Sequence, residues 1–319
     1  MYPATGEHPR TARRGRPWRW VALVASILVV LGVGGLFVAR AVSTPSVARG
    51  TVALPNLPWP GEGQAAAEVE GVGTLGSSGE QTPVPIASVT KVMTAYVVLH
   101  DHPLTGEQHG PDITVDAQAH DEAESSASTG ESTVWVLAGQ QFSERELLEA
   151  MLIPSGNNIA RLFARWDAGS EDAFVRKMNA MAASLGMSQT TYTGSSGVED
   201  STVSTATDQL ILARVAMNSD VLASIVNIRS IRIPGISGVI DNTNTLLGRD
   251  GVIGLKTGST SAAGGALMWA ARTDGSRLVV GVVLYQQPGG SATAGLDAAL
   301  ATSQTLIEGI EHALPALGR

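Results

Sequence analysis

Cysteine is absent from the 319 residues, so the chain has no disulfide framework, no thiolate nucleophile and no cysteine-ligated metal site. Histidine occurs only six times, and no pair of histidines has the H-E-x-x-H spacing of a helical zinc site. A basic excess is also missing, since the formal net charge is −8, whereas nucleic-acid-binding proteins usually present a basic face. We therefore predict no metal, no cofactor and no nucleic-acid partner.

One long apolar run is present near the N-terminus, where residues 20–39 suffice to cross a bilayer as a helix. The positive-inside rule predicts a single-pass cell-membrane anchor there, with a basic cytoplasmic tail at residues 1–19 and the rest of the chain outside the cytoplasm. The A-x-A pattern of residues 39–41 leaves a cleaved signal peptide as the alternative, but signal-peptide apolar regions are shorter than this run. The basic tail contains Arg10, Arg13, Arg14, Arg16 and Arg19.

Residues 40–62 are predicted to be a linker, because four prolines with serine and glycine discourage regular structure. Residues 63–319 then form the predicted globular domain, which is long enough for a packed core. Helix signals dominate the first two thirds of this domain. They are an apolar stretch at 88–99, a capping box at Ser143 and Glu146, a run at 157–166, a start at Ser170 with an end at Gly186, and a start at Thr205 with Asp208.

Strand signals are concentrated in the last third. Residues 278–285 form a continuous valine-rich run, residues 265–271 precede it, and Asp274-Gly275 between them is typical of a hairpin turn. A last helix at about 292–314 is expected to cover the sheet. Helices segregated from an antiparallel sheet predict an α+β fold rather than an alternating β/α one.

Three short motifs occur in a fixed order along the domain. Ser88-Val89-Thr90-Lys91 has the form S-x-x-K, Ser155-Gly156-Asn157 has the form S-x-N, and Lys256-Thr257-Gly258 is K-T-G. This trio is typical of class A β-lactamases and penicillin-binding proteins. Each motif alone is weak, but all three in this order are a specific signal.

The chain resembles the serine-type D-alanyl-D-alanine carboxypeptidases, the low-molecular-mass penicillin-binding proteins, over roughly residues 83–284. The resemblance implies an antiparallel sheet flanked by helices, as in β-lactamases and penicillin-binding transpeptidases. It rests on the three motifs and on the segments Ala87–Tyr96, Ser204-Thr205-Ala206 with Asp208, and Asn242-Thr243-Asn244.

The S-x-x-K spacing has a chemical reason. Residues i and i+3 share one helix face, which brings Lys91 beside Ser88. Serine is a poor nucleophile without a base, and lysine is a base only when its amine is neutral. We expect burial and a second cation, Lys256, to lower the pKa of Lys91. Ser88 at a helix start would also direct backbone N–H groups at the reacting carbonyl.

The family resemblance implies the remaining catalytic and substrate-binding roles. Ser155 would relay a proton to the leaving amine, and Asn157 would hydrogen-bond the amide backbone of the substrate. Lys256 and Thr257, on a predicted edge strand, would bind the terminal carboxylate, which needs a cation and a hydroxyl donor.

The residues after Lys256 and Thr257 complete the predicted site. Gly258 would leave room for substrate to approach the strand. The backbone N–H of Ser259 would form the oxyanion hole together with that of Ser88. Thr260 fits the family, which often has threonine at this position.

Two further patterns have structural interpretations. Gly71, Gly73 and Gly76 match G-x-G-x-x-G, but prolines rather than a helix start follow them, so we interpret the segment as a hairpin and not as a dinucleotide site. The acidic run from Asp116 to Glu131 is predicted to be a solvated loop rather than a metal site, although it could border the cleft.

The resemblance implies an enzyme that removes the terminal D-alanine from peptidoglycan stem peptides through an acyl-enzyme on Ser88, and that binds penicillin and other β-lactams as inhibitors. A transpeptidase or endopeptidase would share the catalytic residues. A β-lactamase is one alternative, although no E-x-x-L-N segment lies between Asn157 and Lys256. A non-catalytic wall-binding module on the same fold is another, which predicts a lost nucleophile or base, yet both are present.

Overall fold

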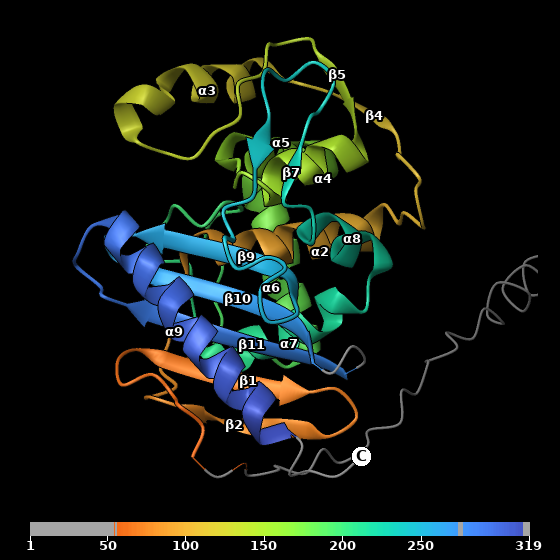
Figure 1. The fold of residues 1–319 in the computed structure, drawn as a ribbon. Helices are drawn as coiled ribbons and strands as arrows, with labels where there is room; N and C mark the ends of the chain where they lie inside the picture. The colour runs from red at the N-terminus through yellow and green to blue at the C-terminus, as the bar shows by residue number, and fades with distance from the viewer. Residues whose placement is uncertain (1–53, 55, 274–276, 315–319) are drawn as a thin grey trace, which may run out of the picture. The chain divides into compact units, whose positions relative to one another are not determined.

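A computed structural model describes residues 54, 56–273 and 277–314 of the chain. Its main sheet has five antiparallel strands in the order β2-β1-β11-β10-β9, which places β9 at one edge (Figure 1). This arrangement confirms the predicted α+β class and the predicted antiparallel sheet. The strands are β1 (Gln64–Val69), β2 (Gly73–Ser78), β9 (Val252–Thr260), β10 (Gly264–Thr273) and β11 (Arg277–Gln286).

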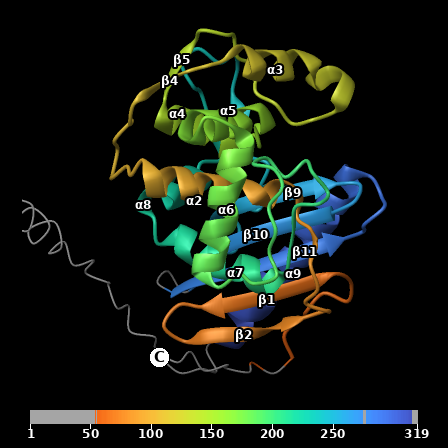
Figure 2. The same ribbon diagram turned by 180° about the vertical axis from the view of Figure 1, so that it is seen from behind.

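Helices cover both faces of the sheet (Figures 1 and 2). Helix α9 lies on one face, and the other helices lie on the opposite face and beyond β9. The helices described are η1 (Ala87–Thr90), α2 (Lys91–Asp101), α3 (Ala117–Thr129), α4 (Glu144–Leu152), α5 (Asn157–Ala168), α6 (Glu171–Leu185), α7 (Ala206–Met217), α8 (Asp220–Val226) and α9 (Ala292–Ala313). Short two-stranded pairs are β3 (Val84–Pro85) with β6 (Val203–Ser204), β4 (Asp112–Thr114) with β5 (Gln141–Ser143), and β7 (Ser230–Ile231) with β8 (Ile240–Asp241).

The sheet separates two apolar cores because side chains alternate along a strand. In β10, Leu267 and Trp269 pack in the core beneath α9, whereas Met268 and Ala270 pack in the larger core beneath the other helices. A strand that is buried on both faces needs apolar residues at successive positions, which explains the continuous valine-rich run at residues 278–285. Leu54 and Leu57, within the segment predicted as a linker, are also buried in the core under α9.

Most of the local predictions are confirmed. Ser143 and Glu146 form a capping box at α4, the Ser170 side chain caps α6, and α6 ends at Gly186 in the left-handed conformation. Thr205 caps α7, and the glycine-rich segment 71–76 forms the hairpin that joins β1 and β2. The predicted turn at 274–275 lies outside the described residues, although β10 and β11 pair on either side of it.

The predicted loop at Asp116–Glu131 is wrong, because most of this run forms α3. Asp116 starts the helix by accepting a hydrogen bond from the N–H of Ala119, at 2.8 Å. Arg165, from α5, binds the same carboxylate with two nitrogens at 2.6 and 2.9 Å. The arginine that compensates this acidic segment is distant in the sequence, so local composition could not predict the helix.

Within the described ranges, no single helix is both long and apolar enough to cross a membrane, and only the bent pair α7 and α8 taken together satisfies the same measures. The predicted anchor at residues 20–39 lies outside these ranges.

Candidate active site

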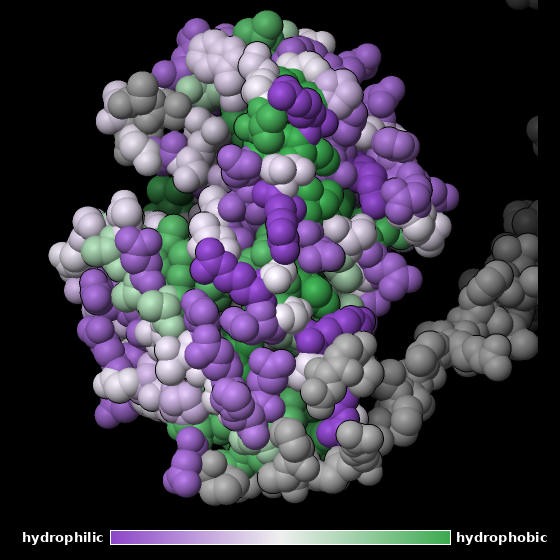
Figure 3. Space-filling model, viewed as in Figure 1, coloured by the Kyte–Doolittle hydropathy of each residue, from purple (hydrophilic) through white to green (hydrophobic). Residues whose placement is uncertain are grey.

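The three motifs meet between the helices and the edge strand of the sheet. Ser88 lies in η1 and Lys91 begins α2, Ser155 and Asn157 lie where α4 passes into α5, and residues 256–258 lie in β9. The molecular surface is hollowed between α3 and the end of β9 (Figure 3). The K-T-G segment therefore does occupy an edge strand beside the other two motifs, as predicted.

Ser88 is held in a tight turn that needs support from its surroundings. The preceding residue, Ala87, has φ +46°, which is costly for a residue with a side chain. Thr90 Oγ1 donates a 2.7 Å hydrogen bond to the Ala87 carbonyl. A glycine is required at Gly197, because a Cβ there would overlap that same carbonyl. The fold thus fixes the backbone on which the predicted nucleophile sits.

Lys91 Nζ makes three short hydrogen bonds, of 2.8 Å to Ser88 Oγ, 2.6 Å to Asn157 Oδ1 and 2.7 Å to the Ser196 carbonyl. The amide and carbonyl oxygens can only accept, so they occupy two N–H groups of the lysine. An ammonium would donate its third N–H to Ser88, whereas a neutral amine directs its lone pair there. Loss of one proton therefore converts Lys91 from a donor to Ser88 into a base for Ser88.

The electrostatic surroundings favour the neutral amine. Burial lowers the pKa of Lys91 well below its usual value, because the side chain is fully enclosed and its charge would lose hydration. The positive charges of Lys256 and Arg161 lower this pKa further, and Glu199 and Glu131 act in the opposite direction. Burial also lowers the pKa of Lys256 to about 7. These shifts agree with the expected role of Lys91.

Lys256 and Thr257 are joined by Thr243, a residue that sequence reasoning did not assign to the site. Thr243 Oγ1 and Thr257 Oγ1 are 2.6 Å apart. Lys256 Nζ lies 3.2 Å from the Thr257 carbonyl and 3.5 Å from each threonine hydroxyl. One ammonium and two hydroxyls converge here, which is a donor set suited to a carboxylate. The sequence signal that could have identified Thr243 was the resemblance of the Asn242-Thr243-Asn244 segment to the carboxypeptidase family.

Ser155 lies in the strained turn between α4 and α5. Its φ is +70° and its side chain is buried. Within the described part of the chain, its Oγ has no hydrogen-bond partner, although a buried hydroxyl usually has one. The relay predicted for Ser155 thus has no direct hydrogen bond to Lys91 or Lys256, and it stays a prediction.

Gly258 lies where β9 approaches the nucleophile turn most closely. A Cβ built on Gly258 would lie 3.0 Å from the carbonyl oxygen of Ile86 and from the backbone nitrogens of Ser88 and Val89. The adjacent Ser259 of β9 pairs with Gly265 of β10, and this register fixes the face of the sheet on which the Ser259 side chain lies. This close approach places the backbone N–H of Ser88 beside β9, while the oxyanion hole predicted from the N–H groups of Ser88 and Ser259 stays a prediction.

Thr260 lies at the end of β9, where its Oγ1 accepts a 3.0 Å hydrogen bond from the N–H of Ala263. This contact stabilises the turn between β9 and β10. Any contribution of Thr260 to substrate binding stays a prediction.

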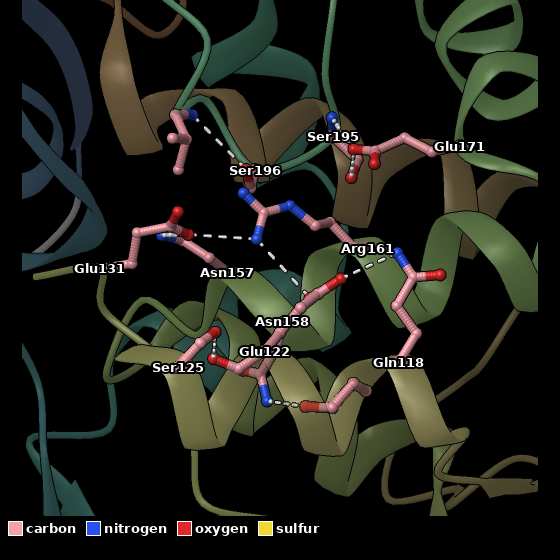
Figure 4. Close-up of polar contacts among 12 residues, drawn as sticks. Gln118, Glu122, Ser125, Glu131, Asn157, Asn158, Arg161, Glu171, Ser195 and Ser196 are labelled. Atoms are coloured by element: carbon pink, nitrogen blue, oxygen red, sulfur yellow. Dashed lines mark hydrogen bonds and ion pairs between the residues drawn. The ribbon is translucent and has the colours of Figure 1, made fainter. Parts of the chain in front are cut away.

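Two segments outside the three motifs also contribute to the site, and only the second was expected from the sequence. The first is the 195–197 loop, whose Ser196 carbonyl accepts a hydrogen bond from Lys91. Glu171 fixes this loop, because its carboxylate accepts hydrogen bonds from the Ser195 N–H at 2.9 Å and from the Ser195 Oγ at 2.6 Å. The second is the end of the acidic run, where Glu131 accepts from Asn157 Nδ2 at 3.2 Å (Figure 4). The acidic run does border the site, as expected, but its contact is with the S-x-N motif.

Among the residues that the structure describes, no group of three or more histidine, aspartate or glutamate side chains could hold a metal ion.

An α+β sandwich with a serine–lysine pair at a helix start, facing an edge strand with K-T-G, defines the penicillin-binding class of serine enzymes. A sequence profile of the D-alanyl-D-alanine carboxypeptidase family matches residues 71–287, and the chain belongs to this family of serine-type peptidases.

Similar proteins of known name support this membership. The chain is 34% identical over 240 residues to D-alanyl-D-alanine carboxypeptidase DacB2 of Mycobacterium tuberculosis, covering 73% of this chain and 77% of that protein. It is 28% identical over 271 residues to DacC of Escherichia coli, covering 82% of this chain and 64% of that protein.

Among solved structures, the Streptomyces K15 DD-transpeptidase has the same fold, with a TM-score of 0.68 at 24% identity over 81% of this chain and 98% of that chain. A putative penicillin-binding protein homologue from Mycobacterium tuberculosis gives a TM-score of 0.66 at 29% identity, over 82% of this chain and 94% of that chain.

Proposed function

We propose that the protein removes the terminal D-alanine from peptidoglycan stem peptides through an acyl-enzyme on Ser88. The observation that carries this proposal is the 2.8 Å hydrogen bond between Ser88 Oγ and the amine of a fully buried lysine, Lys91. The family supports the substrate class, because its description and that of DacB2 name D-alanyl-D-alanine as the target.

In the acylation step, Lys91 accepts the proton of Ser88 while Ser88 Oγ attacks the carbonyl carbon between the two D-alanines. The backbone N–H groups of Ser88 and Ser259 stabilise the oxyanion that forms. Cleavage of the C–N bond leaves an ester on Ser88, and the proton passes through Ser155 to the amine of the departing D-alanine. Water then attacks the ester, and the peptide shortened by one residue leaves with Ser88 restored.

Substrate binding uses the donors that surround the serine–lysine pair. The terminal carboxylate binds the ammonium of Lys256 and the hydroxyls of Thr257 and Thr243. Asn157 Nδ2 has two N–H groups, so it can donate one to Glu131 and the other to a substrate carbonyl. Gly258 makes room for the nucleophile turn, since a side chain there would press against the backbone of Ile86, Ser88 and Val89.

A groove beside the site supports a peptide substrate longer than the two reacting residues. It has a volume of about 330 Å³ and begins at Pro154, next to the S-x-N turn. Trp135 and Val239 line it and are about half exposed, at 55% and 51%. We assign this groove to the part of the stem peptide upstream of the reacting amide.

The decisive assay combines two measurements on the wild-type protein. Because a β-lactam resembles the D-Ala-D-Ala amide and its opened ring stays attached, penicillin should form a long-lived adduct, seen as an increase in intact mass. A peptide ending in D-Ala-D-Ala should release D-alanine. Rapid penicillin turnover without peptide cleavage would instead assign a β-lactamase, and neither reaction from folded protein would assign a non-catalytic module. Transfer to an added amine in place of water would indicate a transpeptidase.

We also propose that the catalytic domain, residues 63–319, is held outside the cytoplasm by a membrane helix at residues 20–39. Residues 1–19 would remain in the cytoplasm and residues 40–62 would serve as the linker. The support is the arginine-rich tail followed by an uncharged apolar run, and the external location of the peptidoglycan substrate.

Protease added to intact cells should remove the domain from about residue 41 onward, because the part of the linker before the buried Leu54 and Leu57 would be exposed. A cytoplasmic protein must stay intact in the same sample, as a control for lysis. Full-length protein that is protected and recovered in the cytosol would contradict the proposed topology.

A further inference from the structure

The side chain of Asn157 connects the predicted base to an acidic residue outside the three motifs. Its Oδ1 accepts from Lys91 Nζ at 2.6 Å, and its Nδ2 donates to Glu131 Oε2 at 3.2 Å. Asn157 is only 4% exposed, so these protein partners determine how its amide lies. The two ends of an amide are alike in shape and opposite in hydrogen bonding, and the orientation therefore depends on which partner can only accept.

An ionised carboxylate can only accept hydrogen bonds, so Glu131 selects the amide nitrogen of Asn157. The amide oxygen then faces Lys91. With the Ser196 carbonyl, it takes both N–H groups of a neutral lysine and leaves the lone pair directed at Ser88. If the amide were reversed, its N–H would donate to that lone pair, and the base would be directed at Asn157 instead of Ser88.

Glu131 is itself held in place by α5. Arg161 Nη1 lies 3.1 Å from Glu131 Oε2, and the same nitrogen lies 3.6 Å from Glu122 of α3 (Figure 4). The backbone beside Glu131 is also fixed, since the Asn157 N–H donates to the Ser132 carbonyl at 2.8 Å. The arginine and the two glutamates are mostly buried, with side-chain exposures of 14%, 17% and 24% for Arg161, Glu122 and Glu131.

The geometry points to Glu131 as a positioning residue for acylation: held by Arg161, it orients the amide of Asn157 so that the Lys91 lone pair faces Ser88. This inference rests on the proposed function, because it concerns the same serine–lysine pair. Glu131 acts through Asn157, which accepts a hydrogen bond from the base directly.

Glu131 also has an electrostatic effect that can be separated from its orienting effect. The charged groups that act on Lys91 are Lys256 from β9, Arg161 from α5, Glu199 after the 195–197 loop, and Glu131. The negative charge of Glu131 raises the pKa of Lys91. Removing the charge while keeping an oxygen acceptor should therefore move the acidic limb of the rate profile to lower pH.

Three variants of the full chain separate these effects, with the second-order rate of penicillin acylation measured against pH. Glu131→Ala removes the acceptor and should lower the rate at its maximum by about 10- to 100-fold, as expected for a misdirected catalytic group. Glu131→Gln keeps an acceptor, because Arg161 Nη1 donates to the same oxygen as Asn157 Nδ2 and would hold the amide oxygen there. Its rate should stay within about threefold of wild type at the maximum, with its acidic limb at lower pH. Glu122→Gln is the matched control, since Glu122 contacts Arg161 but not Asn157, and should change neither quantity.

Wild-type acylation by Glu131→Ala would overturn this inference and leave the proposed function intact. Equal losses in Glu131→Ala and Glu122→Gln would also overturn it, because they would indicate a structural role of the whole acidic cluster. If Glu131→Ala fails to fold, the larger Glu131→Leu takes its place, because it also lacks an acceptor for Asn157 Nδ2, and wild-type acylation by that variant counts against the inference. Failure of the wild-type protein to acylate would overturn the proposed function itself.

Discussion

Ser88→Ala is expected to abolish both the penicillin adduct and the release of D-alanine. The substitution removes the oxygen that forms the ester, and no other group can form the same bond from the start of η1. Removal of a serine nucleophile commonly costs about 10⁴-fold or more in rate, so residual activity should fall below detection. Intact mass after penicillin treatment and a D-alanine assay on the same preparation measure the two losses.

The fold should survive this change, because Ser88 is only partly buried and its turn is fixed by Thr90 and Gly197. Unchanged thermal unfolding would verify this. Ser188→Ala is a suitable control, since it removes an exposed hydroxyl just after α6 and should leave both activities at the wild-type level. A penicillin adduct that persists in Ser88→Ala would assign the nucleophile to another residue, with Ser155 the first to be tested.

Lys91→Arg is expected to be nearly as inactive as Ser88→Ala. Arginine stays protonated at every pH at which the protein is folded, so it cannot accept the proton of Ser88. General-base catalysis contributes about 10²- to 10⁴-fold, and we expect a loss of acylation in that range or above. Acylation at the wild-type rate by Lys91→Arg would show that a different group is the base.

The pH profile of the wild-type protein gives a second measure of the same chemistry. Lys91 acts when neutral, so the rate should rise with pH through its lowered pKa. Lys256 binds the carboxylate when protonated, so kcat/KM should fall again as pH rises past about 7, where burial has brought its pKa. A bound carboxylate stabilises the ammonium of Lys256, and the alkaline limb of kcat should therefore lie at higher pH than that of kcat/KM.

The two limbs are linked, because the positive charge of Lys256 lowers the pKa of Lys91. A profile measured from about pH 5 to about pH 10 with a D-Ala-D-Ala peptide covers both limbs. A rate that falls continuously with rising pH would contradict a neutral lysine base.

Local sequence patterns predicted those parts of the fold that depend on neighbouring residues. The capping box at Ser143, the helix end at Gly186 and the hairpin at residues 71–76 each involve contacts within a few positions, and each is confirmed. The S-x-x-K spacing likewise required Lys91 to lie beside Ser88, because one helix turn brings residues i and i+3 together.

Patterns that depend on distant partners could not be predicted in this way. The acidic run at 116–131 has the composition of a solvated loop, yet Arg161 and Arg165 of α5 stabilise it as α3 and place Glu131 against Asn157. The Ser196 carbonyl left no signal in the sequence, since every residue has a backbone carbonyl.

The sequence by itself determined the α+β class of the fold and the chemical groups of the site. These groups are the serine, the lysine and the K-T-G segment, together with the pairing of Ser88 with Lys91. These follow from residue type and short spacing. Only the tertiary structure decided how the base is directed, because the two other acceptors of Lys91, Asn157 and Ser196, lie 66 and 105 residues away along the chain. A lysine in solvent would be charged and free to rotate. Burial favours the neutral amine, and two fixed acceptors direct its lone pair at the serine.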